Sequence, residues 1–122
     1  MLRRTIKKQD PYFLCNQTVT VYREKDGEYV RTVYDRAYLD FKKNLNVDKA
    51  GSWETNSFLL VIPGSEQTVF VNDRVMLGEG PEITSESSWK SFLPVHVPGL
   101  VVVKFADPKY REGKLVHTEA GG

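Results

Sequence analysis

Cysteine and histidine are the scarcest reactive residues in this sequence. Cys15 is the only cysteine, and His96 and His117 are the only histidines, among 122 residues. A single cysteine excludes an intrachain disulfide and is typical of a reducing compartment, so we expect Cys15 to act as a small buried or half-buried apolar side chain. A structural zinc ion needs three or four converging cysteine or histidine ligands. Structural zinc is therefore excluded, and we expect no cofactor.

Long apolar runs and an excess of charge of one sign are also absent. No apolar stretch approaches the length of a membrane span, and the start of the chain lacks the apolar region of a secretion signal. Lys and Arg total 17 against 16 Asp and Glu, which gives a net charge of +1. This balance provides no global attraction to nucleic acid or to an anionic membrane. We expect a protein that stays in the cytoplasm where it is made, without a membrane partner.

The one local imbalance of charge lies at the start of the chain. Four basic residues meet only one acidic residue, Asp10, within the first ten positions. The basic residues are Arg3, Arg4, Lys7 and Lys8. This stretch is either a solvated, frayed terminus or an arm that touches phosphate or an acidic surface of a partner. We expect residues 1–16 to form a flexible basic arm.

Two-residue alternation of apolar and polar side chains is the main pattern that is present. In Thr18 to Arg23, Val19 and Val21 alternate with polar neighbours, as in a half-buried strand. Asp26-Gly27 then supplies residues that accept positive φ, so a hairpin with a returning strand from Tyr29 is expected. The returning strand continues to Phe41, and Asp35-Arg36 interrupts its rhythm like a bulge or bend.

Further short strands follow, separated by turn signals. Phe58 to Ile62 is apolar at every position and ends at Pro63-Gly64, so it predicts a core strand covered on both faces. The remaining expected strands are 68–71, 74–77, 92–97, 100–106 and a short one at 115–118. Two polar stretches, 42–56 and 78–91, read as long loops, the second with a weak helical turn at 84–89.

Together these elements predict an all-β fold. With 40% hydrophobic and 27% charged residues, the composition is that of one soluble domain spanning residues 1–122. Six or seven short strands with turns between them favour a small antiparallel β-barrel or sandwich that carries two long polar loops. No internal repeat and no sustained helical period appears in the sequence.

A catalytic set of residues is not found. The stretch Gly78-Glu79-Gly80 lacks the third glycine and the lysine of a phosphate-binding loop, and two glutamates nearby would repel phosphate. No G-x-S-x-G elbow is present. We expect His96, between Val95 and Val97 in a strand, to face solvent, and His117 beside Glu119 to do the same. The carboxylates of the 78–91 stretch read as solvated charge. The sequence therefore predicts a protein that is not an enzyme.

Both tryptophans lie in the polar stretches, which is unusual for a residue that normally buries most of its surface. Trp53 belongs to 42–56 and Trp89 to 78–91. Each either packs back over the end of the barrel or anchors a contact with a subunit or partner. The sequence leaves both alternatives open.

The order of these features resembles a family of small phage proteins that complete the head after DNA packaging, called head-closure, stopper or minor capsid proteins. The resemblance covers roughly residues 17–122 and is carried by short β-turn patterns. They are TVTVYR with its DG turn, the polar loop that follows, FLLVIPG, NDRVMLGEGP with Asp73-Arg74 before an apolar triplet and a glycine, and the ending HTEAGG.

The resemblance implies a small β-barrel that assembles as a ring at the head–tail connector of a phage or prophage. The ring would close the head below the portal and adaptor and above the tail-completion proteins, and retain the packaged double-stranded DNA without sequence specificity. The 42–56 loop would project into the channel, facing DNA through Lys42, Lys43, Lys49 and Trp53. Asp48 and Glu54 in the same loop depart from a purely basic pattern. Assembly or partner contacts would involve Trp89 and the basic arm with Arg3, Arg4, Lys7 and Lys8. The protein would act in the host cytoplasm during assembly and then in the virion.

Two alternatives remain. A tail-terminator or tail-tube protein of the virion has a similar size, but such proteins tend to pack a helix on the sheet. A cytoplasmic β-barrel module that binds nucleic acid or a peptide would use the basic start and exposed aromatic side chains such as Tyr22, Tyr34 and Tyr38.

Overall fold

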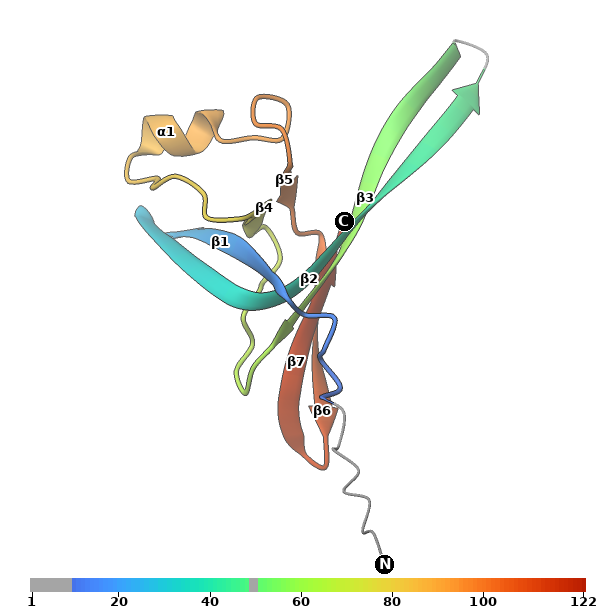
Figure 1. Ribbon diagram of the computed structural model, residues 1–122. Helices are drawn as coiled ribbons and strands as arrows, with labels where there is room; N and C mark the ends of the chain where they lie inside the picture. Colours follow the sequence, from blue (N-terminus) through green and yellow to red (C-terminus); the bar gives the residue numbers. More distant parts are fainter. Residues whose placement is uncertain (1–9, 49–50) are drawn as a thin grey trace, which may run out of the picture.

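The chain folds into a single curled antiparallel sheet (Figure 1). The computed structural model describes residues 10–48 and 51–122, with residues 43–48 and 51–56 described by their backbone. The elements in chain order are β1 (Gln17–Lys25), β2 (Glu28–Asp48), β3 (Gly51–Pro63), β4 (Arg74–Leu77), α1 (Glu86–Ser91), β5 (Leu100–Val102), β6 (Phe105–Arg111) and β7 (Lys114–Gly121).

The seven strands lie in the order β5-β4-β1-β2-β3-β7-β6, and every neighbouring pair is antiparallel. The sheet curls into a half-barrel, which confirms the predicted small all-β fold of six or seven strands (Figure 1). β2 lies at the centre of this order and joins its two halves. One half consists of β1, β4 and β5, and the other of β3, β7 and β6.

The hairpin of β1 and β2 has the turn and the bulge that the sequence predicts. Asp26 and Gly27 take φ values of 51° and 80°, so both central residues adopt the left-handed conformation that a two-residue hairpin turn needs. Gln17 pairs with Ala37 and Val19 with Tyr34, so β2 holds one more residue than β1 in this interval. The extra residue falls at Asp35-Arg36, where the strand bends.

The prediction of a polar loop at 42–56 is wrong. β2 and β3 continue as a two-stranded ribbon from Lys42 opposite Ser57 to Asp48 opposite Gly51, and this ribbon projects from the half-barrel (Figure 1). Backbone hydrogen bonds between the two strands need no particular side chains. Alternation of apolar and polar residues arises only where one face of a strand is buried, so a ribbon outside the core gives no such signal.

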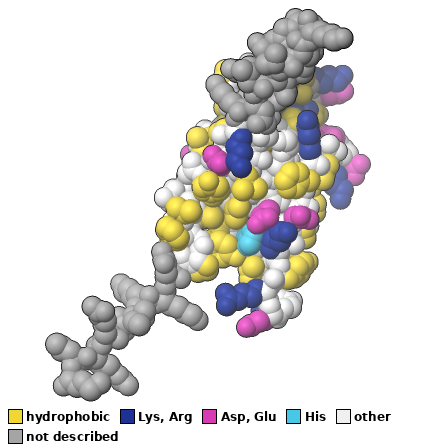
Figure 2. All heavy atoms as spheres, turned by 90° about the vertical axis from the view of Figure 1, so that its right-hand side faces the viewer, with side chains coloured by type: hydrophobic (Ala, Val, Ile, Leu, Met, Phe, Trp, Pro, Cys, Tyr) yellow, Lys and Arg dark blue, Asp and Glu magenta, His cyan; other side chains and the backbone are white. Residues whose placement is uncertain are grey.

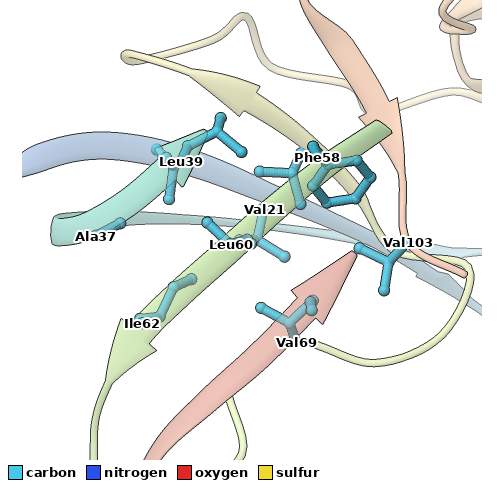
Figure 3. Close-up of a cluster of buried hydrophobic side chains, with 11 residues drawn as sticks. Val21, Ala37, Leu39, Phe58, Leu60, Ile62, Val69 and Val103 are labelled. Carbon is cyan, nitrogen blue, oxygen red and sulfur yellow. The ribbon is translucent and has the colours of Figure 1, made fainter. Parts of the chain in front are cut away.

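The core fills the concave side of the curl. Figure 3 shows side chains from β1, β2 and β3 meeting Val69 and Val103, which come from irregular segments. The buried members are Val19, Val21, Ala37, Leu39, Phe58, Leu60, Ile62, Val69, Val75, Val103 and Ala120. β3 is a core strand as predicted, but Leu59 and Val61, on its opposite face, are only half-buried. Its cover on that face is partial.

A smaller cluster lies on the other side of β1 and β4. It contains Tyr22, Ile83, Phe92 and Leu100, with Met76, Trp89 and Val97 packed against them. Residues of the 78–99 segment therefore cover this half of the sheet from outside. Tyr22, which the nucleic-acid alternative treats as exposed, is 1% exposed and donates its hydroxyl to the Pro81 carbonyl at 2.7 Å. That expectation is wrong for Tyr22.

Two predicted strands do not form, and a third is divided. Residues 68–71 run irregularly, and residues 92–97 form turns in which the Leu93 carbonyl accepts from the amides of both His96 and Val97. Pro94 within this stretch and Pro98 directly after it lack the amide hydrogen that a strand ladder requires. The predicted strand 100–106 breaks at Val103, where the chain leaves β4 and crosses to β7.

Candidate interaction surfaces

The projecting ribbon contains the residues predicted to face DNA. Lys42 is exposed at its base, and the backbone register places Lys43 opposite Asn56 and Trp53 opposite Asn46. Lys49 lies outside the described residues. Within the described residues, β2 pairs with β3 alone from Tyr38 onward, and the pairing of β3 with β7 begins only at Leu59. The ribbon therefore has two free edges.

A cleft with two arginines lies beside the start of β4, and we call it the arginine cleft. Its volume is about 460 Å³. It is lined by Arg23, Glu24, Lys25, Phe70, Val71, Asn72, Asp73, Arg74, Trp89, Leu93 and Val102. The guanidinium of Arg23 lies 4.2 Å from the ring centre of Phe70, an exposed aromatic side chain. The cleft thus combines cationic and aromatic groups at the molecular surface.

Asp73 organises the floor of the arginine cleft. Its carboxylate is 1% exposed and accepts hydrogen bonds from Arg23 Nε at 2.9 Å and Nη2 at 2.6 Å. The same carboxylate accepts from the Phe70 amide at 2.9 Å and so closes the turn at Asn72, whose φ is 77°. The hydrogen bond to Asp73 raises the pKa of Arg23, because it stabilises the charged form of the guanidinium. Asp73 therefore fixes β1 against the chain entering β4.

The glycine-rich stretch after β4 is bound to the neighbouring strands. Thr20, which is buried, donates to the Gly78 carbonyl at 2.7 Å and accepts from the Gly80 amide at 2.9 Å. Arg31 on β2 donates through Nε to the Gly80 carbonyl at 3.0 Å. A side chain at Gly80 would collide with the hydroxyl of Tyr22. The NDRVMLGEGP segment thus has structural roles at both of its ends.

Trp89 packs back onto the molecule, which is one of the two alternatives that the sequence leaves open. Ser85 caps α1 by accepting the Ser88 amide at 3.2 Å, and the helix confirms the turn predicted at 84–89. The guanidinium of Arg74 lies 3.6 Å from the Trp89 ring centre and donates to the carbonyls of Trp89 and Phe92. The indole remains partly accessible at the rim of the arginine cleft.

Residues 10–16, at the end of the expected arm, contact the sheet. Tyr12 and His117 on β7 form a hydrogen bond of 2.8 Å between the hydroxyl and Nδ1, and His117 Nε2 lies 3.2 Å from Glu119. Asp10 pairs with Arg36 at 2.6 Å. Cys15 is buried as predicted, which raises the pKa of its thiol. Arg3, Arg4, Lys7 and Lys8 lie outside the described residues.

The face that carries His117 is mixed in character. Figure 2 shows apolar side chains gathered around a small group of charged ones on this side of the molecule. Lys109 on β6 lies 3.9 Å from Glu119 and 3.6 Å from Asp107, which extends the charged group across two strands. His117, expected at the surface, is instead half-buried, because Tyr12 covers it. His96 is exposed, as expected.

An apolar groove lies at the base of the ribbon. Its volume is about 600 Å³. It is lined by Phe41, Phe58, Pro94, Pro98, Gly99, Leu100, Val101, Val102, Lys104 and Gly122. Lys104 is its one charged lining residue. One wall is β5, whose described pairing is with β4 alone, and the other wall is the point where β2 and β3 leave the sheet. Sequence reasoning missed this groove because its walls come from distant segments.

The last two residues are tightly packed, and Gly122 lines this groove. A side chain at Gly121 would lie 2.5 Å from the Phe105 ring and 2.8 Å from the Phe58 carbonyl oxygen. A side chain at Gly122 would lie 2.8 Å from the Val102 carbonyl oxygen. Both positions therefore need glycine for close approach rather than for a turn. The HTEAGG stretch belongs to β7 up to Gly121.

A catalytic or metal arrangement is not evident in these surfaces. Neither the arginine cleft nor the apolar groove is lined by a histidine. In residues 10–48 and 51–122, no three His, Cys, Asp or Glu side chains are placed to hold a metal ion. No helix in this described part of the chain has the length and apolar character to cross a membrane.

Comparison with known proteins gave one match. A family model described as a family of unknown function, DUF6751, matches residues 14–122. No curated protein and no solved structure matched the chain. The matched range includes all seven strands and leaves out the basic residues at the start.

Proposed function

We propose that this chain, which belongs to the DUF6751 family of unknown function, is a structural protein of a phage or prophage head–tail connector. It assembles as a ring, closes the head, contacts the portal or adaptor and the tail-completion proteins, and retains packaged DNA. It acts by assembly and position rather than by catalysis. The observation that carries the proposal is the ribbon that projects from a half-barrel (Figure 1).

The shape of the molecule supports a role in a ring. A half-barrel has open strand edges, and exposed edges pair readily with another chain unless they are covered. Several large apolar side chains are also exposed, with Val95 at 81%, Tyr110 at 63% and Phe13 at 56%. Contacts between different patches on identical subunits generate a closed ring when the rotation between neighbours closes.

The ribbon supports a role in holding DNA. It is the part of the described fold that reaches farthest from the core, and lysines lie at its base in positions 42 and 43. Lysines that face a DNA channel attract phosphate without reading sequence, and this attraction weakens as salt increases. A channel protein needs such weak, non-specific contact because DNA must pass through it during ejection.

The short helix argues against the tail alternative. α1 has six residues and is the only helix in the described part of the chain. A tail-terminator or tail-tube protein tends to pack a helix on its sheet, whereas α1 has no buried residue. The connector therefore remains the better explanation among the virion proteins.

The test is binding to a portal–adaptor complex from the phage or prophage whose genome encodes this chain. We expect the purified chain to bind this complex as a ring, visible by electron cryomicroscopy, and heads completed with it to keep their DNA. The double variant Lys42→Glu/Lys43→Glu should still form the ring but lose DNA faster, whereas Lys90→Glu on α1 should behave as the wild type. Failure of the wild-type chain to bind the complex would overturn the proposal.

A nucleic-acid-binding module is the second candidate, and the arginine cleft favours it. Arg23, Arg74 and Lys25 line the cleft together with the aromatic rings of Phe70 and Trp89. Cationic groups with stacking platforms are the usual means of binding single-stranded nucleic acid. Tight, salt-dependent binding of single-stranded DNA by the monomer, lost in Arg74→Ala, would favour this candidate over the connector.

A further inference from the structure

In the described part of the chain, the guanidinium of Arg74 forms hydrogen bonds through only one of its nitrogen atoms. Both bonds, to the carbonyls of Trp89 and Phe92, come from Nη1. A guanidinium has five N–H donors, so three remain on Nε and Nη2. Within residues 10–48 and 51–122, these three donors have no acceptor and the side chain has no ion pair. A half-buried cation that lines the arginine cleft therefore has a free Nε–Nη2 edge.

Arg23, in the same cleft, shows what such an edge binds. Its Nε and Nη2 both donate to the Asp73 carboxylate, at 2.9 Å and 2.6 Å. This hydrogen bond raises the pKa of Arg23, whereas burial lowers the pKa of Arg74, because no carboxylate offsets its lost hydration. The charge of Arg74 is uncompensated, and a group with two anionic oxygen atoms fits its free edge.

Lys25 adds a second positive charge at the cleft. It is exposed, and it forms no ion pair with any described residue. Of the two acidic lining residues, Asp73 is paired with Arg23, and Glu24 accepts the Gly27 amide at 3.0 Å. A phosphate monoester carries about two negative charges at neutral pH, so it suits two unpaired cations better than a carboxylate does. The lining has three cationic and two acidic side chains, a net charge of +1, which is too low to attract a run of phosphates.

Phe70 provides an aromatic ring beside these cations. The side chain is 41% exposed, although the guanidinium of Arg23 lies 4.2 Å from its ring centre. Asn72, which follows closely in the chain, is exposed and can both donate and accept hydrogen bonds. Nucleic-acid bases stack on aromatic side chains of this kind. The cleft volume of about 460 Å³ lies within the range of small-molecule sites.

We propose that the arginine cleft binds a nucleotide that ends in a phosphate group. The phosphate oxygens accept hydrogen bonds from Nε and Nη2 of Arg74 and lie beside the ammonium group of Lys25, while the base stacks on Phe70. Such a unit occurs as a free nucleoside monophosphate and at the phosphorylated end of a strand. The inference rests on the second candidate function and narrows it from single strands in general to one terminal nucleotide. It needs no ring and is independent of the connector role.

Calorimetric titration with deoxyadenosine 5′-monophosphate and with deoxyadenosine tests the phosphate contact. We expect the nucleotide to bind at least about tenfold more tightly than the nucleoside, because the nucleoside cannot form the charge-assisted hydrogen bonds to Arg74. N-acetylphenylalanine, which carries a carboxylate and an aromatic ring, should bind more weakly than the nucleotide. Equal or tighter binding of either comparison compound, or no binding of the nucleotide at millimolar concentration, would overturn the inference.

Two exposed positions test the lysine and the ring without a change at Arg74. Lys25→Gln should weaken nucleotide binding about threefold and Phe70→Leu about tenfold, because an exposed charge contributes less than stacking. Lys114→Gln and Phe13→Leu are the controls, since Lys114 also adjoins a two-residue hairpin turn and Phe13 is also exposed. The urea midpoint shows that each variant is folded. Wild-type affinity in both cleft variants would contradict the proposed contacts.

Nuclear magnetic resonance follows Arg74 directly, because replacing this residue also disturbs α1. Its Nε–H signal, assigned by its absence in Arg74→Lys, should shift as the nucleotide is added. The Nε–H signal of Arg23 is the internal control and should move much less, because Asp73 already accepts from it. A nucleotide that binds without shifting the Arg74 signal occupies another site, and the inference is then wrong.

A short deoxyadenosine strand, with and without a 5′-phosphate, separates the two sources of the nucleotide. Tighter binding of the phosphorylated strand supports both the inference and the nucleic-acid module. Binding of the free nucleotide alone supports the inference and contradicts the module. Equal binding of the two strands, without binding of the free nucleotide, supports the module and overturns the inference. Binding to the portal–adaptor complex tests the connector role separately.

Discussion

The buried carboxylate of Asp73 accepts three hydrogen bonds. Two of its hydrogen bonds come from Arg23 on β1 and one from the Phe70 amide. A buried carboxylate is costly unless its oxygens are satisfied, and here a guanidinium and a backbone amide satisfy them. The residue joins two segments that are 50 positions apart in the sequence.

Replacing Asp73 by Ala should destabilise the fold markedly. The change leaves the Phe70 amide and a half-buried guanidinium without their acceptor, at a cost of about 3 kcal/mol. The free energy of unfolding, measured by urea titration, should fall by that amount. Asp107→Ala, which removes an exposed ion pair with Lys109, should stay within about 0.5 kcal/mol of the wild type. Equal losses in the two variants would contradict this role for Asp73.

Gly121→Ala tests the close packing at the end of β7. The new methyl group would meet the Phe105 ring and the Phe58 carbonyl oxygen, and the backbone oxygen cannot move aside cheaply. Overpacking of this kind should lower the free energy of unfolding by about 1–3 kcal/mol. Gly64→Ala is the control, since its nearest atoms would be 3.6 Å and 3.7 Å away. The prediction fails if thermal unfolding of both variants matches the wild type.

At the scale of elements, α1 depends on contacts from outside the helix. It has six residues, none of them fully buried, which is too short for a stable helix in isolation. Ser85 caps its start, and Arg74 from β4 holds its end through two carbonyls and through the Trp89 ring.

Arg74→Lys should therefore loosen α1. Lysine cannot donate to both carbonyls and stack on the indole in the same geometry, so we expect a cost of about 1–2 kcal/mol. In a Trp53→Phe background, the fluorescence of Trp89 should shift to the red as the ring becomes solvated. Lys90→Ala removes only the exposed pair with Glu86 and should leave the spectrum unchanged. An unshifted spectrum in Arg74→Lys would refute the dependence.

Element prediction from the sequence succeeds where one face of a strand is buried. β1, the Asp26-Gly27 turn, the Asp35-Arg36 bulge and β3 follow from alternation or turn chemistry. The ribbon is predicted as a loop because its sequence lacks the two-residue alternation that a strand with one buried face shows. The mostly apolar residues 92–97 resemble a strand in sequence. In the fold they form turns that pack against the smaller cluster, which contains Tyr22. Neither cleft could be predicted, because each joins segments that only the tertiary fold brings together.

At the scale of the whole molecule, one thiol and two phenol groups change the stability in the same direction as pH rises. Burial raises the pKa values of Cys15, Tyr22 and Tyr34 above their ordinary values. As pH rises, these groups therefore ionise at a lower pH in the unfolded chain than in the folded chain. Their ionisation then stabilises the unfolded chain relative to the folded chain. Stability is fully present below the ordinary values, about 8.5 for cysteine and about 10 for tyrosine, and is lost above them.

We expect the urea midpoint to fall between pH values of about 8 and about 10.5, since this interval spans the ordinary pKa values of the thiol and the phenols. Tyr22→Phe removes one ionising group and should reduce this fall, whatever its effect on stability at neutral pH. A midpoint that is constant or rises over this interval would contradict the sign. Titration followed by far-ultraviolet circular dichroism gives the comparison.

β2 runs from the centre of the sheet into the projecting ribbon as one long strand. At roughly 3.3 Å per residue, its 21 residues span on the order of 70 Å. Its partner changes from β1 to β3 between Ala37 and Tyr38, directly after the bend at Asp35-Arg36. One continuous strand therefore connects the ribbon to the point where the partner of β2 changes. This point joins the half that contains β1, β4 and β5 to the half that contains β3, β7 and β6.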